Sequence, residues 1–190
     1  MKILKIVGIT IVVMVILFFG IATFLPSQVH VERTLVIPAS SEIVFDKIND
    51  LREWKHWSPW YQMDPNMEIT YEGFLSGEGA SYSWKSENGG SGTLIITESH
   101  PNKYIATEMD FMNKGKATAF YRLKPVDGGT QVTWAFETTM NNNPVEKYMG
   151  LIIDRMVGTD FEKGLHNLKN HVQQSPSQMM TSDNPERADS

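Results

Sequence analysis

The chain has 190 residues, enough for one domain of ordinary size built around a single hydrophobic core. Its formal net charge of -5, with no visible basic stripe, argues against a nucleic-acid partner. Cysteine is absent, which excludes disulfides, thiolate metal sites and a cysteine nucleophile.

A membrane-spanning helix is predicted near the N-terminus. An uncharged run of twenty residues begins at Ile6 and ends at Leu25, and as a helix it measures about 30 Å, the thickness of a bilayer core. Two lysines precede the run, whereas Glu32 and Arg33 after it cancel, so the positive-inside rule places the N-terminus in the cytoplasm. A cleaved signal peptide is the alternative, but the run is too long and lacks a small-residue cleavage site. We therefore expect residues 1–27 to be a single-pass anchor in the cytoplasmic (inner) membrane, with the remaining chain on the extracytoplasmic side.

The segment after the anchor predicts a strand, a short helix and an aromatic cluster. Residues 29–37 alternate between apolar and polar side chains, the period of a half-buried strand. Ser40 or Ser41 can cap the short helix that follows. Residues 54–61 then hold three of the five tryptophans, and rings at this density either fill a core or line a cavity.

Six further strands are predicted beyond the aromatic cluster. They are separated by turn residues, and consecutive strands joined by hairpins form an antiparallel meander with one face on a core. With residues 29–37 they make about seven strands. The six ranges are 69–74, 81–86, 93–99, 103–109, 116–123 and 131–139.

A long amphipathic helix is predicted from Pro144 to about Val172, because apolar residues recur mostly three or four positions apart. Gly158 interrupts this spacing, which predicts a bend or break there. A twisted sheet and a helix, each with one apolar face, bury both faces when the sheet wraps around the helix. Residues 175–190 lack apolar periodicity, and we expect a disordered tail.

This order of elements resembles the START and Bet v 1-like helix-grip superfamily (SRPBCC), in particular its bacterial polyketide cyclase/dehydrase-like proteins. The resemblance implies an α+β helix-grip domain over residues 28–174, with an antiparallel sheet around the C-terminal helix and an apolar cavity for lipids, sterols or polyketides. It implies no single reaction. The motifs that carry it are Ile37-Pro38-Ala39, the tryptophan-serine-proline-tryptophan at 57–60, Asp64-Pro65, Gly77-x-Gly79-Ala80, and the segments 130–134 and 161–169.

The residues that would line such a cavity are large side chains whose strand or helix faces converge. The same side chains would serve a solid core, and for the tryptophan cluster a packing role is favoured because a pocket wall and a core look alike in sequence. The candidates are Trp54, Trp57, Trp60, Trp84, Tyr121, Trp134, Phe136, Tyr148, Ile152 and Met156.

Catalytic and metal sites find little support. His56, within the aromatic cluster, is the best of weak candidates for a general acid or base, although the sequence fixes no partner for it. Glu162 and His166 share a helix face, but two ligands make a poor metal site. We predict no catalytic set, no metal and no cofactor.

Three functions remain open. The first is a membrane-anchored module that binds a hydrophobic small molecule or lipid between the sheet and the C-terminal helix, with the tether holding it near its ligand. The second is a polyketide cyclase or dehydratase that uses His56. The third is a partner-binding module with a filled core. The enzyme is less supported because no catalytic constellation is visible.

Overall fold

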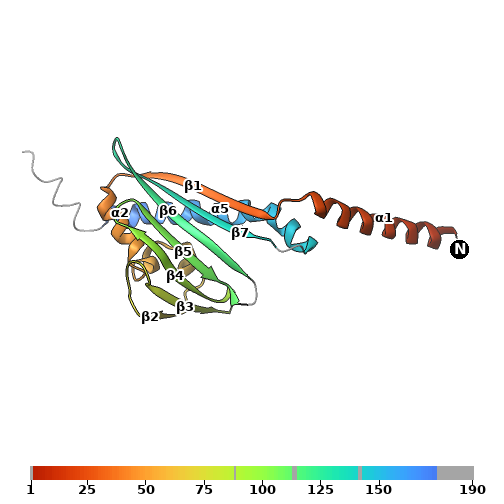
Figure 1. The fold of residues 1–190 in the computed structure, drawn as a ribbon, viewed down its shortest axis with the longest axis horizontal. Coiled ribbons are helices and arrows are strands. Elements are labelled where there is room, and N and C mark those ends of the chain that lie inside the picture. The colour runs from red at the N-terminus through yellow and green to blue at the C-terminus, as the bar shows by residue number, and fades with distance from the viewer. Residues whose placement is uncertain (1, 88, 113–114, 141–142, 175–190) are drawn as a thin grey trace, which may run out of the picture.

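The chain forms an N-terminal helix followed by an antiparallel sheet that curves around a long C-terminal helix (Figure 1). The computed structural model describes residues 2–87, 89–112, 115–140 and 143–174. The predicted tail, residues 175–190, lies outside the described residues. Helix α1 (Lys2–Phe24) projects away from the domain, at the end where the C-terminal helix begins.

The sheet has seven strands, in the order β1-β7-β6-β5-β4-β3-β2, and every neighbouring pair is antiparallel. The predicted number of strands and the meander are therefore confirmed, although β2 is shorter than the predicted range 69–74. The strands are β1 (Gln28–Ile37), β2 (Glu68–Glu72), β3 (Ser81–Ser86), β4 (Gly90–His100), β5 (Tyr104–Asp110), β6 (Lys116–Val126) and β7 (Gly129–Thr139).

Three short helices connect β1 to β2, and the first of them begins as its sequence predicts. Helix α2 (Ser41–Asn49) is capped by Ser40, whose hydroxyl accepts from the Ile43 amide at 3.4 Å. Helices α3 (Trp54–Trp57) and α4 (Pro59–Met63) follow, with a proline in the first turn of α4. The last helix, α5 (Pro144–Gln173), is capped by Asn143, whose side-chain oxygen accepts from the Val145 amide at 3.0 Å.

The core lies between the concave face of the sheet and α5. Along β1, Val31 is buried whereas Glu32 is exposed, and this alternation continues in the other long strands. From the helix, the side chains of Phe161, Leu165 and Leu168 are at most 2% exposed. The sheet therefore wraps around the helix, and the predicted α+β helix-grip fold is confirmed.

Helix α5 runs unbroken from Pro144 to Gln173, so the predicted break at Gly158 is wrong. Gly158 instead provides room for Arg33 on β1, because an added Cβ would lie within 2.5 Å of the Arg33 guanidinium carbon. Arg33 then pairs with two helix carboxylates, Asp154 at 3.2 Å and Glu162 at 2.9 Å. A glycine rather than an apolar residue therefore occupies this position of α5, because the Arg33 side chain passes over the helix there.

Candidate ligand-binding site

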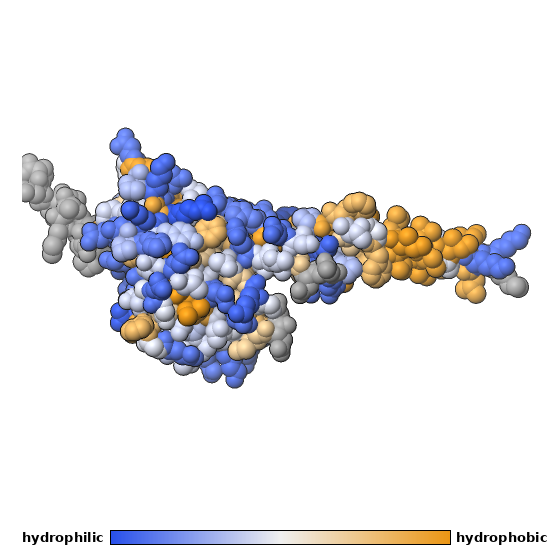
Figure 2. All heavy atoms as spheres, in the orientation of Figure 1, coloured by the Kyte–Doolittle hydropathy of each residue, from blue (hydrophilic) through white to orange (hydrophobic). Residues whose placement is uncertain are grey.

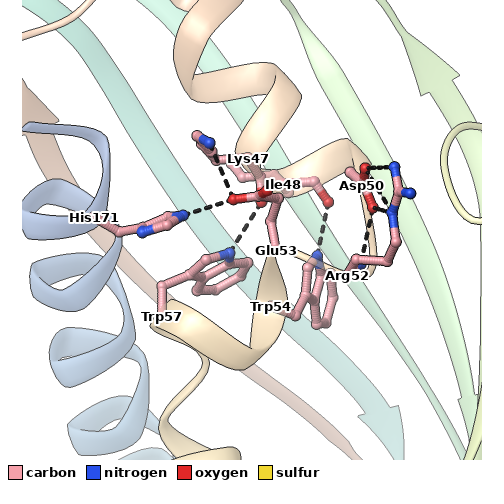
Figure 3. A network of polar contacts seen from close by, with 8 residues as sticks. All are labelled: Lys47, Ile48, Asp50, Arg52, Glu53, Trp54, Trp57 and His171. Carbon is pink, nitrogen blue, oxygen red and sulfur yellow. Dashed lines mark hydrogen bonds and ion pairs between the residues drawn. The ribbon is translucent and has the colours of Figure 1, made fainter. Parts of the chain in front are cut away.

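The aromatic cluster is held by hydrogen bonds to the backbone of α2 (Figure 3). Trp54 Nε1 donates to the Ile48 carbonyl at 2.8 Å, and Trp57 Nε1 donates to the Lys47 carbonyl at 3.0 Å. Both rings are at most 2% exposed. Because both indole donors bond within the protein, neither is available to a ligand.

Glu53, just before α3, links three helices at the C-terminal end of α5 (Figure 3). Its carboxylate accepts from Lys47 Nζ of α2 at 3.0 Å and lies 2.7 Å from His171 Nε2 of α5. Burial disfavours the charged carboxylate, but the hydrogen bonds from His171 and Lys47 together outweigh it and hold the pKa of Glu53 below its ordinary value. This end of the domain is therefore fixed by polar contacts as well as by packing.

Aromatic rings fill the interior next to this end. Trp134 stacks on Phe161 with ring centres 4.0 Å apart, and Trp57 meets Trp134 edge to face at 5.7 Å. Tyr121 lies 5.0 Å from Trp134 and 6.0 Å from Trp54. Four predicted cavity residues, Trp54, Trp57, Tyr121 and Trp134, are thus at most 2% exposed and pack against one another. They occupy the interior at this end.

A second group of predicted residues is only half-buried and borders the filled core. Trp60 of α4, Trp84 of β3 and Phe136 of β7 belong to it, and Tyr61 and Met109 are likewise half-buried and packed against the core. We call these five residues the aromatic rim. Trp60 meets Trp134 edge to face at 5.6 Å, so the rim is continuous with the filled core.

Two buried polar atoms of this region have no hydrogen-bond partner among the described residues, Tyr61 Oη and Trp134 Nε1. Buried donors are nearly always paired, and leaving one unpaired costs about 1 to 3 kcal/mol. Burial, followed by smaller effects of Tyr82 and Tyr71, raises the pKa of Tyr61 well above its ordinary value. Tyr71 acts partly through a weak side-chain hydrogen bond, although the two hydroxyls do not meet with regular hydrogen-bond geometry. Tyr61 therefore carries a neutral hydroxyl that can donate to an acceptor.

The three predicted cavity residues on α5 lie elsewhere. Tyr148 is half-buried and stacks on Phe18 of α1 with ring centres 4.7 Å apart, while Ile152 and Met156 are exposed. The structure therefore does not bring these three together with the tryptophans. The periodicity of α5 is regular, but near its N-terminus the apolar residues lie on a face that the sheet does not cover.

His56 lies on α3 with an exposed ring stacked on His171, the ring centres 4.9 Å apart. Partial burial and then the neighbouring His171 lower the pKa of His56 below its ordinary value. Of the other predicted pair, Glu162 bonds Arg33 and His166 is exposed. Among the described residues, no three histidine, aspartate or glutamate side chains are grouped as metal ligands.

A hollow of about 460 Å³ lies on the opposite, convex face of the sheet. It is formed where β1, β7, β6 and β5 adjoin, and it includes His30, Glu108, Lys116 and Glu137. Its charged lining pairs internally, for example Lys116 with Glu108 at 2.8 Å. None of the predicted cavity residues borders it.

Sequence reasoning missed three residues that organise this region: Arg33, Glu53 and Tyr61. Arg33 carried a signal, since it occupies an inward position in the alternation of its strand, where a charge needs partners. Glu53 and Tyr61 adjoin the tryptophans but carried none, because their roles depend on contacts far along the chain.

The fold is shared with solved structures of low sequence identity. The Staphylococcus aureus protein SA2116, of unknown function, has a TM-score of 0.62 and 16% identity, covering 79% of this chain and 96% of its own. The di-domain ARO/CYC protein StfQ from the steffimycin biosynthetic pathway has a TM-score of 0.60 and 10% identity, and the match covers 77% of this chain and 51% of StfQ. Ara h 8.0201 has a TM-score of 0.54 and 12% identity, covering 78% and 99%.

No curated protein matches the chain. Residues 28–173, however, match the family described as polyketide cyclase/dehydrase and lipid transport, and the matched range covers β1 through α5. The filled aromatic core and the half-buried rim lie within this range. The chain therefore belongs to the polyketide cyclase/dehydrase and lipid-transport family.

Proposed function

We propose that the domain binds a hydrophobic small molecule or lipid at the aromatic rim while α1 anchors it in the cytoplasmic membrane. The observation that carries the proposal is the buried hydroxyl of Tyr61, which makes no hydrogen bond of regular geometry and has only the neighbouring Tyr71 as a weak partner in an otherwise apolar rim. An apolar wall with one convergent donor suits an amphiphile such as a fatty acid, whose chain would pack on the rim and whose oxygen would accept from Tyr61. The family description, which includes lipid transport, supports this ligand class.

The anchoring part of the proposal is supported by the exposure and composition of α1. Among the described residues, α1 is the one helix long and apolar enough to cross a membrane, and only 6% of its most apolar stretch is buried. Figure 2 shows most of its visible surface as hydrophobic, apart from a hydrophilic N-terminal tip, in contrast to the mainly polar domain. A helix so exposed is not a core helix of the domain, and its length favours an anchor over a signal peptide. The lysines at its N-terminal end support an orientation in which the domain lies outside the cytoplasm.

The test measures binding of a fluorescent fatty acid by the full chain in detergent micelles, comparing wild type with Tyr61→Phe. Losing one hydrogen bond of about 1 kcal/mol weakens binding about five-fold. The same change removes an unpaired buried donor, so the ligand-free variant should melt no lower than wild type. Tyr104→Phe, on the convex face of the sheet, is the matched control and should leave binding unchanged.

Equal affinity for wild type and Tyr61→Phe would remove Tyr61 from the site. Failure of the wild type to bind any fatty acid or to carry lipid in native mass spectrometry would contradict the proposal. The tight packing of Trp54, Trp57, Tyr121 and Trp134 would then favour the alternative of a partner-binding module with a filled core.

A further inference from the structure

We propose that the N-terminal half of α5 inserts an apolar stripe into the membrane leaflet from which α1 emerges. The apolar stripe consists of Val145, Met149, Ile152 and Met156, whose side chains are 57%, 48%, 47% and 58% exposed. Residues three and four apart form one line along a helix, so these four side chains make a continuous strip. This inference rests on the proposed anchoring of α1 and adds a second membrane contact.

The opposite face of α5 is the one that packs on the domain. A Cβ at Gly150 would lie 3.2 Å from Val29, and Asp154 pairs with Arg33, so both positions face β1. With 3.6 residues per turn, the line through Gly150, Asp154 and Gly158 lies about 170° from the apolar stripe. The stripe therefore points away from the sheet.

The contact between α5 and α1 sets the level of the stripe relative to the bilayer. Tyr148 donates its hydroxyl proton to the Phe18 carbonyl at 3.0 Å, and the two rings stack at 4.7 Å. Phe18 precedes Leu25, where the apolar run ends, by seven residues, or about 10 Å of helix. If the run fills the bilayer core, Tyr148 and its neighbours Val145 and Met149 lie at the level of the acyl chains.

The distribution of charge along α5 also points to lipid as the occupant. Glu146 and Lys147 are half-buried and lie one turn before Gly150, on the side that faces the sheet. The line of the stripe continues beyond Met156 to Thr159 and Lys163, which are exposed and polar. On this line of α5, exposed apolar side chains are thus confined to the first 16 Å or so, the part nearest α1, as expected of a helix that rises out of an interface.

Insertion would bring the aromatic rim close to its source of ligand. Ile153 and Val157 lie beside the stripe on α5, are half-buried, and pack against the same buried core cluster as Trp60 and Phe136 do. They form an apolar connection between the stripe and the rim. A lipid leaving the bilayer along α5 would therefore meet apolar side chains throughout.

The test uses the absence of cysteine, which makes every introduced cysteine unique. The full chain is placed in phosphatidylcholine nanodiscs with an environment-sensitive fluorophore on Met149→Cys, Met156→Cys, Lys163→Cys or Phe19→Cys. Brominated lipid should quench the label at 149 about two-fold or more and at 156 less, because an interfacial helix is buried by about 5 to 10 Å. Lys163→Cys, on the same line of α5, should be unaffected, and thermal melts should show that each labelled variant is folded.

The label at 19 reports the anchor independently, because Phe19 lies on the exposed surface of α1. Quenching at 19 without quenching at 149 would overturn the inference while leaving the anchor intact. No quenching at 19 would overturn the anchor and, with it, the inference. Energy transfer between two labelled copies at 149, without lipid quenching, would show that a second chain covers the stripe and would also overturn the inference.

Discussion

The packing of α5 against the filled core is tested by Gly164→Ala. An added Cβ would lie 2.5 Å from Cζ3 of Trp134 and 3.1 Å from Cδ of Pro59. Trp134 cannot move away, because its ring stacks on Phe161 at 4.0 Å and contacts Trp57 edge to face. The close approach of helix and indole therefore depends on the missing side chain.

The magnitude follows from two opposing effects. Overpacking a rigid core costs up to about 3 kcal/mol, while replacing glycine by alanine within a helix returns about 1 kcal/mol. The expected net loss for Gly164→Ala is about 2 kcal/mol, or about 4 to 8 °C in melting temperature for a domain of this size. Circular dichroism or scanning fluorimetry on the full chain measures this shift.

Gly150→Ala is the matched control on the same helix. Its added Cβ would meet only side-chain carbons at wider distances, Val29 Cγ2 at 3.2 Å and Met140 Cγ at 3.6 Å, so its melting temperature should equal or exceed that of wild type. If Gly164→Ala melts as high as Gly150→Ala, the contact between Trp134 and α5 is looser than the structure shows, and the filled core with it.

Three further changes test other parts of the domain. Gly158→Ala should displace the Arg33 guanidinium from its carboxylates, so that salt lowers the melting temperature of wild type more than that of the variant. Because folding lowers the pKa of Glu53, the ionised carboxylate stabilises the folded state above pH 4.5, its ordinary pKa, and this stabilisation is lost as the pH falls through the folded pKa. In that pH range, the stability of Glu53→Gln should therefore depend less on pH than that of wild type. Asn143→Ala should lower the free energy of chemical unfolding by about 1 kcal/mol because the helix cap is lost, and Asn143→Ser should restore that stability. For each of these three changes, a variant that responds as the wild type does would contradict the prediction.

Most of the fold could be predicted because its signals are local. Alternation marks the strands, turn residues mark the hairpins, and a regular period of three to four marks α5. The ambiguous position was Gly158, which local rules treat as a helix breaker. Its role depends on Arg33, which lies more than a hundred positions earlier in the chain. The sequence would have indicated this role only if the inward-facing charge on the strand had been matched with the glycine on the facing helix.

The site was less predictable, because a core and a pocket wall use the same side chains. Trp57 and Trp84 have the same chemistry in the sequence, yet the structure buries the first and leaves the second half-exposed. Burial depends on how far the sheet closes over α5, which no local pattern encodes. The apolar period of α5 likewise could not distinguish Ile152, which is exposed, from Leu165, which is in the core.

The two ends of α5 differ in how they are held, and this bears on where a ligand would enter. At the C-terminal end, His171 contacts Glu53, and Asn167 donates to the Trp57 carbonyl at 3.1 Å, so three helices are cross-linked by polar contacts. Toward the N-terminal end, the stripe side of α5 is exposed, and segments with few buried contacts open at the lowest free energy. We therefore expect opening at the end nearest α1 rather than at the tryptophan-filled end.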